Sequence, residues 1–210
     1  SVPPGTRTAL NITGVNLREN RGATKDSIAR GDVLVKKGLG GTVEAIDVLI
    51  SKSDREIRGM RQSKRALRTG REVMFHHGSM GVPARIHFLG QRSLSPGETV
   101  LAELRFHEPI YVFVGDGFVI RDASLGLTLA GGIVLDEDAN RRAFRKPFQA
   151  EFLEVRRQAP NDLDVLVSSQ LRRDKVAFIP NLLAKSAFSA EEILQSVEKA
   201  VEAGEFSRNG

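Results

Sequence analysis

Cysteine is absent from this 210-residue chain. Its absence excludes disulfide bridges and thiolate metal sites, and it fits a cytoplasmic location. No run of about 18 apolar residues occurs, so we expect no helix that spans a membrane. The first residues carry no secretory signal pattern. What is present, 40% hydrophobic and 27% charged residues, is typical of a globular protein of one or two domains.

Catalytic motifs are missing as well. The phosphate-binding pattern GxxxxGK followed by Ser or Thr does not occur, and neither does the nucleophile pattern GxSxG. The carboxylates of Asp136, Glu137 and Asp138 fall in a predicted turn, where solvation explains them better than acid–base chemistry. We therefore predict no catalytic residue in this chain.

Four histidines suggest a metal site, but their spacing argues against one. His76 and His77 are adjacent on a predicted strand and so point to opposite faces. No cysteine or close carboxylate pair completes a tetrahedral ligand set with these or with His87 and His107. We predict no metal ligand.

The charge is unevenly spread. The chain carries a formal net charge of +5, which favours an anionic partner. Residues 1–150 hold 23 Lys and Arg against 16 Asp and Glu, whereas residues 151–210 hold 8 against 10. A change of sign of this kind indicates a domain boundary.

The most basic segment is 52–72, with eight Lys and Arg against three Asp and Glu. Such a run attracts nucleic acid, because each neutralised phosphate releases counterions. The alternative interpretation is a solvated loop whose charge only keeps the protein in solution. The candidate phosphate contacts in this run are Arg58, Arg61, Lys64 and Arg65.

Short strands are predicted through the middle of the chain, where apolar and polar residues alternate. Val82, Ala84, Ile86 and Phe88 are the inward positions of one such strand. Several strands joined by Gly, Pro and Ser turns indicate an antiparallel barrel or sandwich. The predicted strands are 43–52, 72–77, 82–89, 99–106, 111–114, 118–122 and 127–135.

The N-terminal part is predicted to hold two more strands, 6–15 and 32–35, joined by an exposed polar loop over 16–27. Two strands without sheet partners would leave backbone N–H and C=O groups unpaired. We therefore expect this chain to be a fragment of a longer protein.

Helical periodicity begins after a basic linker, 141–146, that Pro147 closes. We predict that a first helix starts with 152–158, that a second helix is capped by Asn161, and that a short helix covers 180–186. Ser189 and Glu192 form a capping box for a last helix that ends at Gly204. Short helix, turn and longer helix are typical of a helix-turn-helix.

Residues 115–136 read as strand, turn, strand. Asp122, Ser124 and Gly126 supply turn chemistry, and Gly131 with Gly132 indicates a bulge or a close approach of two backbones. This hairpin resembles the last hairpin of domain III in the elongation factor Tu superfamily, and is most similar to the selenocysteine-specific elongation factors. The positions that carry the resemblance are Phe118, Ile120, Arg121, Asp122, Thr128, Leu129, Ala130, Gly131, Gly132 and Val134.

Further motifs occur in the order that the same family has them. His76-His77-Gly78-Ser79, Leu94-x-Pro96-Gly97 and Ala102-x-Leu104 are similar to its domain III. Gly5-x-Arg7 and Arg30-Gly31-Asp32 are similar to the end of its domain II. The resemblance covers about residues 5–136, and its strength is the collinearity of motifs that are individually weak.

The resemblance implies a mainly β fold with a helical C-terminal part. We expect the end of a domain II-like β-barrel in 1–40, a domain III-like antiparallel β-barrel in 41–140, and a partial winged-helix domain in 147–210. The last helix carries mostly acidic exposed positions, so we expect a spacer or docking role for it rather than direct reading of nucleic acid.

The resemblance also implies a function: delivery of selenocysteinyl-tRNA to the ribosome at recoded UGA codons. GTP and Mg²⁺ would bind a domain that this sequence lacks, and a messenger-RNA hairpin would bind further winged helices. The barrel would contact tRNA, and the alternative is that Asp122 and Ser124 only hold their turn. The implied tRNA-binding residues are Arg58, Arg61, Lys64, Arg65, His76, His77, Arg121, Asp122 and Ser124.

Two other readings stay open at this point. One is domain III of another translational GTPase, with a different tRNA or release factor. The other is a docking adaptor that binds a protein through apolar surface. The helical tail argues against elongation factor Tu itself, which ends after its barrel. Salt dependence separates RNA binding from apolar docking.

Overall fold

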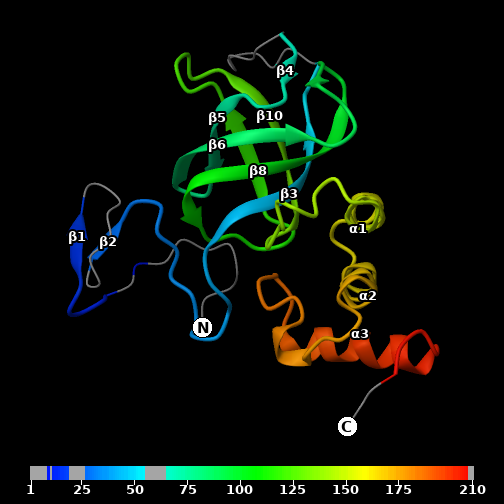
Figure 1. The fold of residues 1–210 in the computed structure, drawn as a ribbon. Coiled ribbons are helices and arrows are strands. Elements are labelled where there is room, and N and C mark those ends of the chain that lie inside the picture. Colours follow the sequence, from blue (N-terminus) through cyan, green and yellow to red (C-terminus); the bar gives the residue numbers. More distant parts are fainter. Residues whose placement is uncertain (1–8, 10, 19–26, 55–64, 208–210) are drawn as a thin grey trace. The chain divides into compact units, whose positions relative to one another are not determined.

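The computed structural model describes residues 9, 11–18, 27–54 and 65–207. The chain divides into two compact units, Ser1–Leu34 and Val35–Gly210. The first unit holds two short parallel strands, β1 (Asn16–Arg18) and β2 (Ser27–Ala29). The second unit holds a closed barrel and three α-helices (Figure 1).

The strand predictions for the N-terminal part are wrong where the structure describes it. Residues 9 and 11–15 are irregular, and so are 32–35. Val33, Leu34 and Val35 are 47%, 58% and 42% exposed, so their apolar side chains gain little from burial. A strand forms where side chains pack against neighbours, and local propensity alone does not suffice. The ends of the predicted loop, in contrast, form β1 and β2.

Six antiparallel strands close the barrel in the order β10-β3-β8-β6-β5-β9 (Figure 1). Strand β9 closes it, because it pairs with β10 on one side and with β5 on the other. Closure removes the unpaired edges that an open sheet would present. The strands are β3 (Val43–Ser51), β5 (Glu72–His77), β6 (Met80–Phe88), β8 (Thr99–Ile110), β9 (Gly117–Arg121) and β10 (Thr128–Asp136).

The barrel and the helical part that follows it confirm the predicted fold. One predicted strand is wrong: residues 111–114 hold only an isolated bridge from Val114 to Ser186. Tyr111 and Val112 are nevertheless buried, which explains their apolar pattern. A small accessory sheet pairs β4 (Leu67–Arg68) with β7 (Ser93–Leu94).

The barrel interior is filled by the alternate side chains that the sequence pattern predicts. Val82, Ala84, Ile86 and Phe88 are all buried. The ring of Phe75 lies 5.1 Å from those of Phe106 and Phe118, centroid to centroid. Each buried Val, Ile or Phe side chain of this set stabilises the fold by roughly 1.5–3 kcal/mol through burial.

The predicted close approach in β10 is confirmed at Gly132. A Cβ there would lie 2.1 Å from the carbonyl oxygen of Leu49 and 2.7 Å from the ring of Phe118. No side chain fits between these two strands, so glycine is required for β10 to pair with β3.

The helices are α1 (Pro147–Gln158), α2 (Leu163–Asp174) and α3 (Ala190–Glu202). Pro147 opens α1 at its first turn, where a missing N–H costs nothing. The N-cap of α2 is Asp162 and not Asn161, because the Asp162 carboxylate accepts the Val165 N–H at 3.1 Å. The capping box of Ser189 and Glu192 is confirmed, and Gly204 follows α3 with a φ of +74°.

The predicted helix over 180–186 is wrong. A single 3-10 turn, η1 (Ile179–Asn181), forms instead. Leu183 has a positive φ of 49°, and the chain then extends so that Ser186 bridges to Val114. Pairing with the barrel side therefore outweighs the local helical tendency. Apolar side chains of α2, α3 and the segment between them pack with Val114; they are Leu166, Val167, Leu182, Leu183, Ile193 and Val197.

Helix α1 covers part of the outer face of the barrel wall. Phe144, Phe152 and Leu153 pack against Leu101 and Leu135. The predicted linker over 141–146 is thus anchored, because the side chain of Phe144 is buried. Arg156 is fully buried, and its guanidinium donates to the carbonyl oxygen of Leu135 at 2.6 Å.

Hydrogen bonds also anchor residues 39–41, the segment that leads into β3. Lys185, which is buried, donates from Nζ to the carbonyl oxygens of Gly41 at 3.3 Å and Glu137 at 3.4 Å. The Tyr111 hydroxyl donates to the carbonyl oxygen of Leu39 at 2.6 Å. We call this set of contacts the Lys185 clasp. None of the described helices is long and apolar enough to cross a membrane.

Candidate nucleic-acid interface

The turn between β9 and β10 is built around Asp122. Its carboxylate accepts the Ser124 N–H at 2.9 Å, the Ser124 hydroxyl at 2.7 Å and the Leu125 N–H at 2.9 Å. Gly126 takes a positive φ of 62°. Asp122 is 7% exposed. Asp122 and Ser124 therefore hold this turn, and their predicted tRNA contact stays a prediction.

Arg71 joins this turn to the start of β5 through an ion pair with Asp122. The hydroxyl and two N–H groups that Asp122 accepts from, together with Arg71, lower the pKa of this carboxyl to about 2. The Arg71 side chain is 40% exposed. The pair thus fixes the arginine at the surface while leaving part of it open to solvent.

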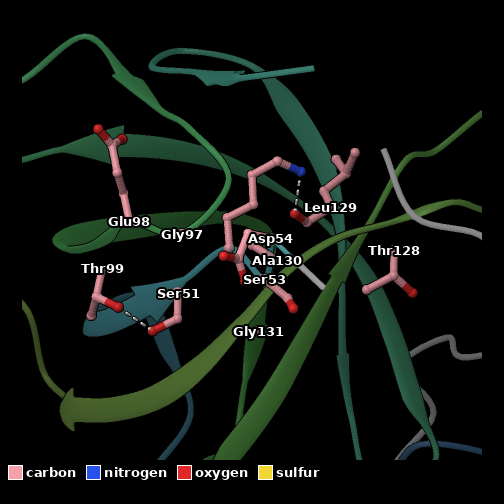
Figure 2. A pocket seen from close by; sticks show the side chains of 11 residues that line it. Ser51, Ser53, Asp54, Gly97, Glu98, Thr99, Thr128, Leu129, Ala130 and Gly131 are labelled. Atoms are coloured by element: carbon pink, nitrogen blue, oxygen red, sulfur yellow. Dashed lines mark hydrogen bonds between the residues drawn. The ribbon is translucent and has the colours of Figure 1, made fainter. Parts of the chain in front are cut away.

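A cavity of about 360 Å³ lies beside this turn, at the start of β10. Figure 2 shows Thr128, Leu129, Ser51 and Thr99 around it, with the hydroxyls of Ser51 and Thr99 joined at 2.7 Å. Lys52 also lines the cavity, and its ammonium donates to the carbonyl oxygen of Leu129 at 2.9 Å. Burial and the nearby charge of Arg71 lower the pKa of Lys52.

A second hollow, of about 670 Å³, is lined by the basic segment that precedes β5. Arg65, Arg68 and Arg71 lie on its walls. Of the predicted site residues, Arg65 is exposed here, whereas Arg58, Arg61 and Lys64 lie outside the described residues. Arg71 thus carries positive charge at the β9–β10 turn, Arg65 and Arg68 line the same hollow as Arg71, and the Lys52 ammonium lies at the start of β10.

The two predicted histidines have different environments. His77 lies with its Nε2 3.0 Å from the carboxylate of Asp116, and its ring is 6.4 Å from that of the core residue Phe75. His76 packs against Gly81, where a Cβ would lie 3.0 Å from the imidazole ring. Burial and the charge of Arg121 lower the pKa of His76.

Arg121 ends β9 and is exposed. In the register of β5 and β9, Met74 is opposite Arg121 and His76 is opposite Val119. Arg121 of β9 and His76 of β5 therefore lie on two paired strands of the barrel, and the turn that Asp122 holds follows β9 directly. We call Lys52, Arg65, Arg68, Arg71 and Arg121 the basic corner.

Sequence reasoning included Lys52, Arg68 and Arg71 in the basic run but did not select them. Lys52 could have been found from its position, because it ends a predicted strand and opens the charged segment. The Arg71–Asp122 pair could not, since it joins residues 51 positions apart. It requires the pairing of β5 with β9.

One prediction about carboxylates is wrong. Asp136 is not a solvated turn residue: it ends β10, is 1% exposed, and pairs with Arg173 of α2. Asp138, two residues on, is exposed as expected. Among the residues that the structure describes, no group of three His, Asp or Glu side chains is arranged to hold a metal ion.

Comparison with known proteins gives a consistent result. A family model described as the beta-barrel domain of the selenocysteine-specific elongation factor matches residues 54–141. The chain is 32% identical over 132 residues, 63% of its length, to the selenocysteine-specific elongation factor of Desulfomicrobium baculatum. It is 33% identical over 172 residues, 82% of its length, to that of Escherichia coli strain K12.

The chain spans 18% and 24% of the length of these two relatives. The matched residues contain most of the barrel, and the longer alignment extends well beyond the barrel match. A closed six-stranded barrel, the collinear motifs and these matches agree with one another. Residues 54–141 therefore match the beta-barrel domain of the selenocysteine-specific elongation factors, and the longer aligned stretch is similar to these proteins.

Proposed function

We propose that this chain is part of a cytoplasmic translation factor that delivers selenocysteinyl-tRNA to the ribosome at recoded UGA codons. The observation that carries the proposal is the match of the barrel to the barrel domain of this family. The barrel contributes tRNA-contacting surface. The helices connect the barrel to winged helices elsewhere in the protein, which bind a messenger-RNA hairpin.

The basic corner supplies the physical means. Guanidinium groups neutralise phosphates, and the released counterions drive binding. Contacts of this kind read the shape of an RNA helix rather than its sequence. The hydrogen bonds of Asp122 keep the β9–β10 turn in one conformation, so Arg71 and Arg121 are presented without a large ordering cost.

The residues of this chain do not fit GTP or Mg²⁺. The sequence contains no phosphate-binding loop of the GxxxxGK type, and the described residues offer no metal-binding group. We therefore assign GTP hydrolysis to another part of the factor and derive no chemical step for this chain.

The test is a titration of the chain with selenocysteine tRNA and with an elongator tRNA, each at two salt concentrations. We expect tighter binding of selenocysteine tRNA and a steep fall with salt. Arg121→Glu should weaken binding several-fold. Lys175→Glu makes the same change of charge in the helical part and should leave binding nearly unchanged.

Two outcomes count against the proposal. Equal and weak binding of both tRNAs would place specificity elsewhere in the factor and leave this chain as a scaffold. Binding of another protein that resists salt, with no RNA binding, would favour a docking adaptor.

A further inference from the structure

Three carboxylates lie side by side beneath the helices on the outer face of the barrel. In the strand register, Asp47 of β3 is opposite Asp136 of β10 on one side and Glu103 of β8 on the other. Their exposed fractions are 0%, 1% and 0%. We call these three residues the carboxylate row. Directly opposite side chains in an antiparallel pair have Cβ atoms about 4.5–5.5 Å apart.

Among the described residues, the two outer carboxylates of the row each pair with an arginine, whereas the middle one does not. Arg173 of α2 pairs with Asp136, and Arg105 of β8 pairs with Glu103. Asp47, in the middle, receives a hydrogen bond from the Gln149 amide of α1 at 2.8 Å. A neutral amide offsets much less of a buried negative charge than a guanidinium does.

One oxygen on each of two neighbouring carboxylates is left over. Within the part of the chain that the structure describes, Asp47 Oδ1 and Glu103 Oε2 are buried and have no hydrogen-bond partner. Two ionised carboxylates in this position would repel each other in a low-dielectric interior and leave both oxygens unsatisfied. A single proton on Asp47 Oδ1, donated to Glu103 Oε2, removes both problems.

We propose that Asp47 and Glu103 form a buried proton-binding site, in which the two carboxyl groups hold one proton between them while α1 is seated on the barrel. Three observations support the site: Asp47 and Glu103 are directly opposite in the register of β3 and β8, both are fully buried, and Gln149 of α1 donates to Asp47. This inference concerns the fold and stands whether or not the barrel binds tRNA.

Charged and titratable groups face the pair from every element packed against it. Burial and the charge of Asp136 raise the pKa of Asp47 to about 8. Burial also raises the pKa of Glu103. The groups around the pair are Asp136 (β10), Arg105 (β8), His87 (β6), Gln149 (α1), Arg173 (α2), and Arg141 and Arg145 of the connecting segment.

His87 is a rival for the proton. It lies opposite Glu103 in the register of β6 and β8, and its Nε2 is buried without a partner among the described groups. Burial and the charges of Arg105, Arg145 and Arg85 lower its pKa, in that order. A neutral imidazole is therefore expected beside the carboxyl pair, and the proton stays between Asp47 and Glu103.

The experiment is a carbon-13 NMR titration of the side-chain carboxyl groups in the whole chain. We expect Asp47 to titrate near pH 8, about four units above an ordinary aspartate. Titration of both Asp47 and Glu103 below pH 5 overturns the proposal. A His87 ring that is charged at pH 7 overturns it equally.

A matched pair of variants gives a second test. Asp47→Asn places a neutral donor where the proton would be, so the fall in melting temperature between pH 6 and pH 9 should shrink by at least half. Asp138→Asn removes an exposed carboxylate nearby and should leave that fall unchanged. A fall that persists in Asp47→Asn contradicts the proposal, and the NMR titration decides the matter if this variant does not fold.

Discussion

Two aspartates on the same barrel have opposite acid–base behaviour. Asp122 and Asp47 are both buried, with 7% and 0% exposed. Asp122 accepts two backbone N–H groups and a hydroxyl and pairs with Arg71, and its pKa falls to about 2. Asp47 accepts one amide between two other carboxylates, and its pKa rises to about 8. Burial and a neighbouring carboxylate raise the pKa of Asp47, whereas the hydrogen bonds to Asp122 outweigh its burial and lower its pKa.

The comparison implies opposite effects of pH on stability. The pKa of Asp122 is depressed on folding, so its contribution is present above its unfolded value near 4 and is lost as the pH falls toward 2. The pKa of Asp47 is raised, so the folded state binds a proton that the unfolded chain releases. The stability that Asp47 contributes is therefore present below about pH 4 and is lost as the pH rises toward 8.

The largest expected effect comes from breaking the strand pairing that creates the carboxylate row. Gly132→Ala should destabilise the fold by about 4 kcal/mol or more, because its Cβ would collide with the Leu49 carbonyl at 2.1 Å. Urea unfolding followed by circular dichroism measures this. Gly117→Ala is the control, since the nearest atom to its Cβ is 4.0 Å away. A loss of under 1 kcal/mol in Gly132→Ala would contradict the described pairing.

The next effect comes from loosening the helices over Asp47 without touching a carboxylate. Arg156→Met should cost about 2–4 kcal/mol in the free energy of unfolding, because it leaves buried acceptors unpaired. Those acceptors are the carbonyl oxygens of Leu135 and Leu166 and the side chains of Ser169 and Gln170. Arg157→Met, on the exposed side of α1, should cost far less, and equal losses would mean that α1 is not seated as described.

A smaller effect is expected at Asp122, and it tests whether Asp122 and Asp47 make stability depend on pH in opposite directions. Asp122→Asn should lower stability at pH 7, and the loss of stability between pH 4 and pH 2 should become shallower than in the parent chain. Urea unfolding at several acid pH values measures both. If the variant loses as much stability between pH 4 and pH 2 as the parent chain, Asp122 is not the group that titrates in this range.

The smallest effect is expected from Ser124→Ala, which removes one of the donors to Asp122. We expect a loss of about 0.5–1.5 kcal/mol and a tRNA affinity within twofold of the parent chain. This outcome would assign Ser124 to the turn. A fall of tenfold or more in affinity, with stability retained, would place its hydroxyl on the RNA.

The sequence predicts the barrel well and the carboxylate row not at all. Strands such as β6 follow from alternation, and the cap of α3 follows from Ser189 and Glu192, because both signals are local. Asp47, Glu103 and Gln149 are brought together by strand register and by a helix about a hundred residues further on. Asp47 reads as an ordinary polar position of a strand until the helices above it are known.

The basic corner lies between these extremes. Its charges are visible as a run, and the turn of Asp122 and Ser124 is visible as a pattern. The link between them is one ion pair that spans the barrel wall. Composition therefore indicates the type of partner, whereas the position of each arginine depends on the closed sheet.

The Lys185 clasp has a consequence for synthesis on the ribosome. The Lys185 ammonium donates a hydrogen bond to the carbonyl oxygen of Gly41, a residue that is synthesised 144 positions earlier. At about 5–20 residues per second, the ribosome adds Lys185 roughly 7–30 s after Gly41. All six strands of the barrel precede Lys185 in the chain. During translation the sheet can therefore close before Lys185 is added, and a contact made late in the chain secures the segment that leads into the barrel.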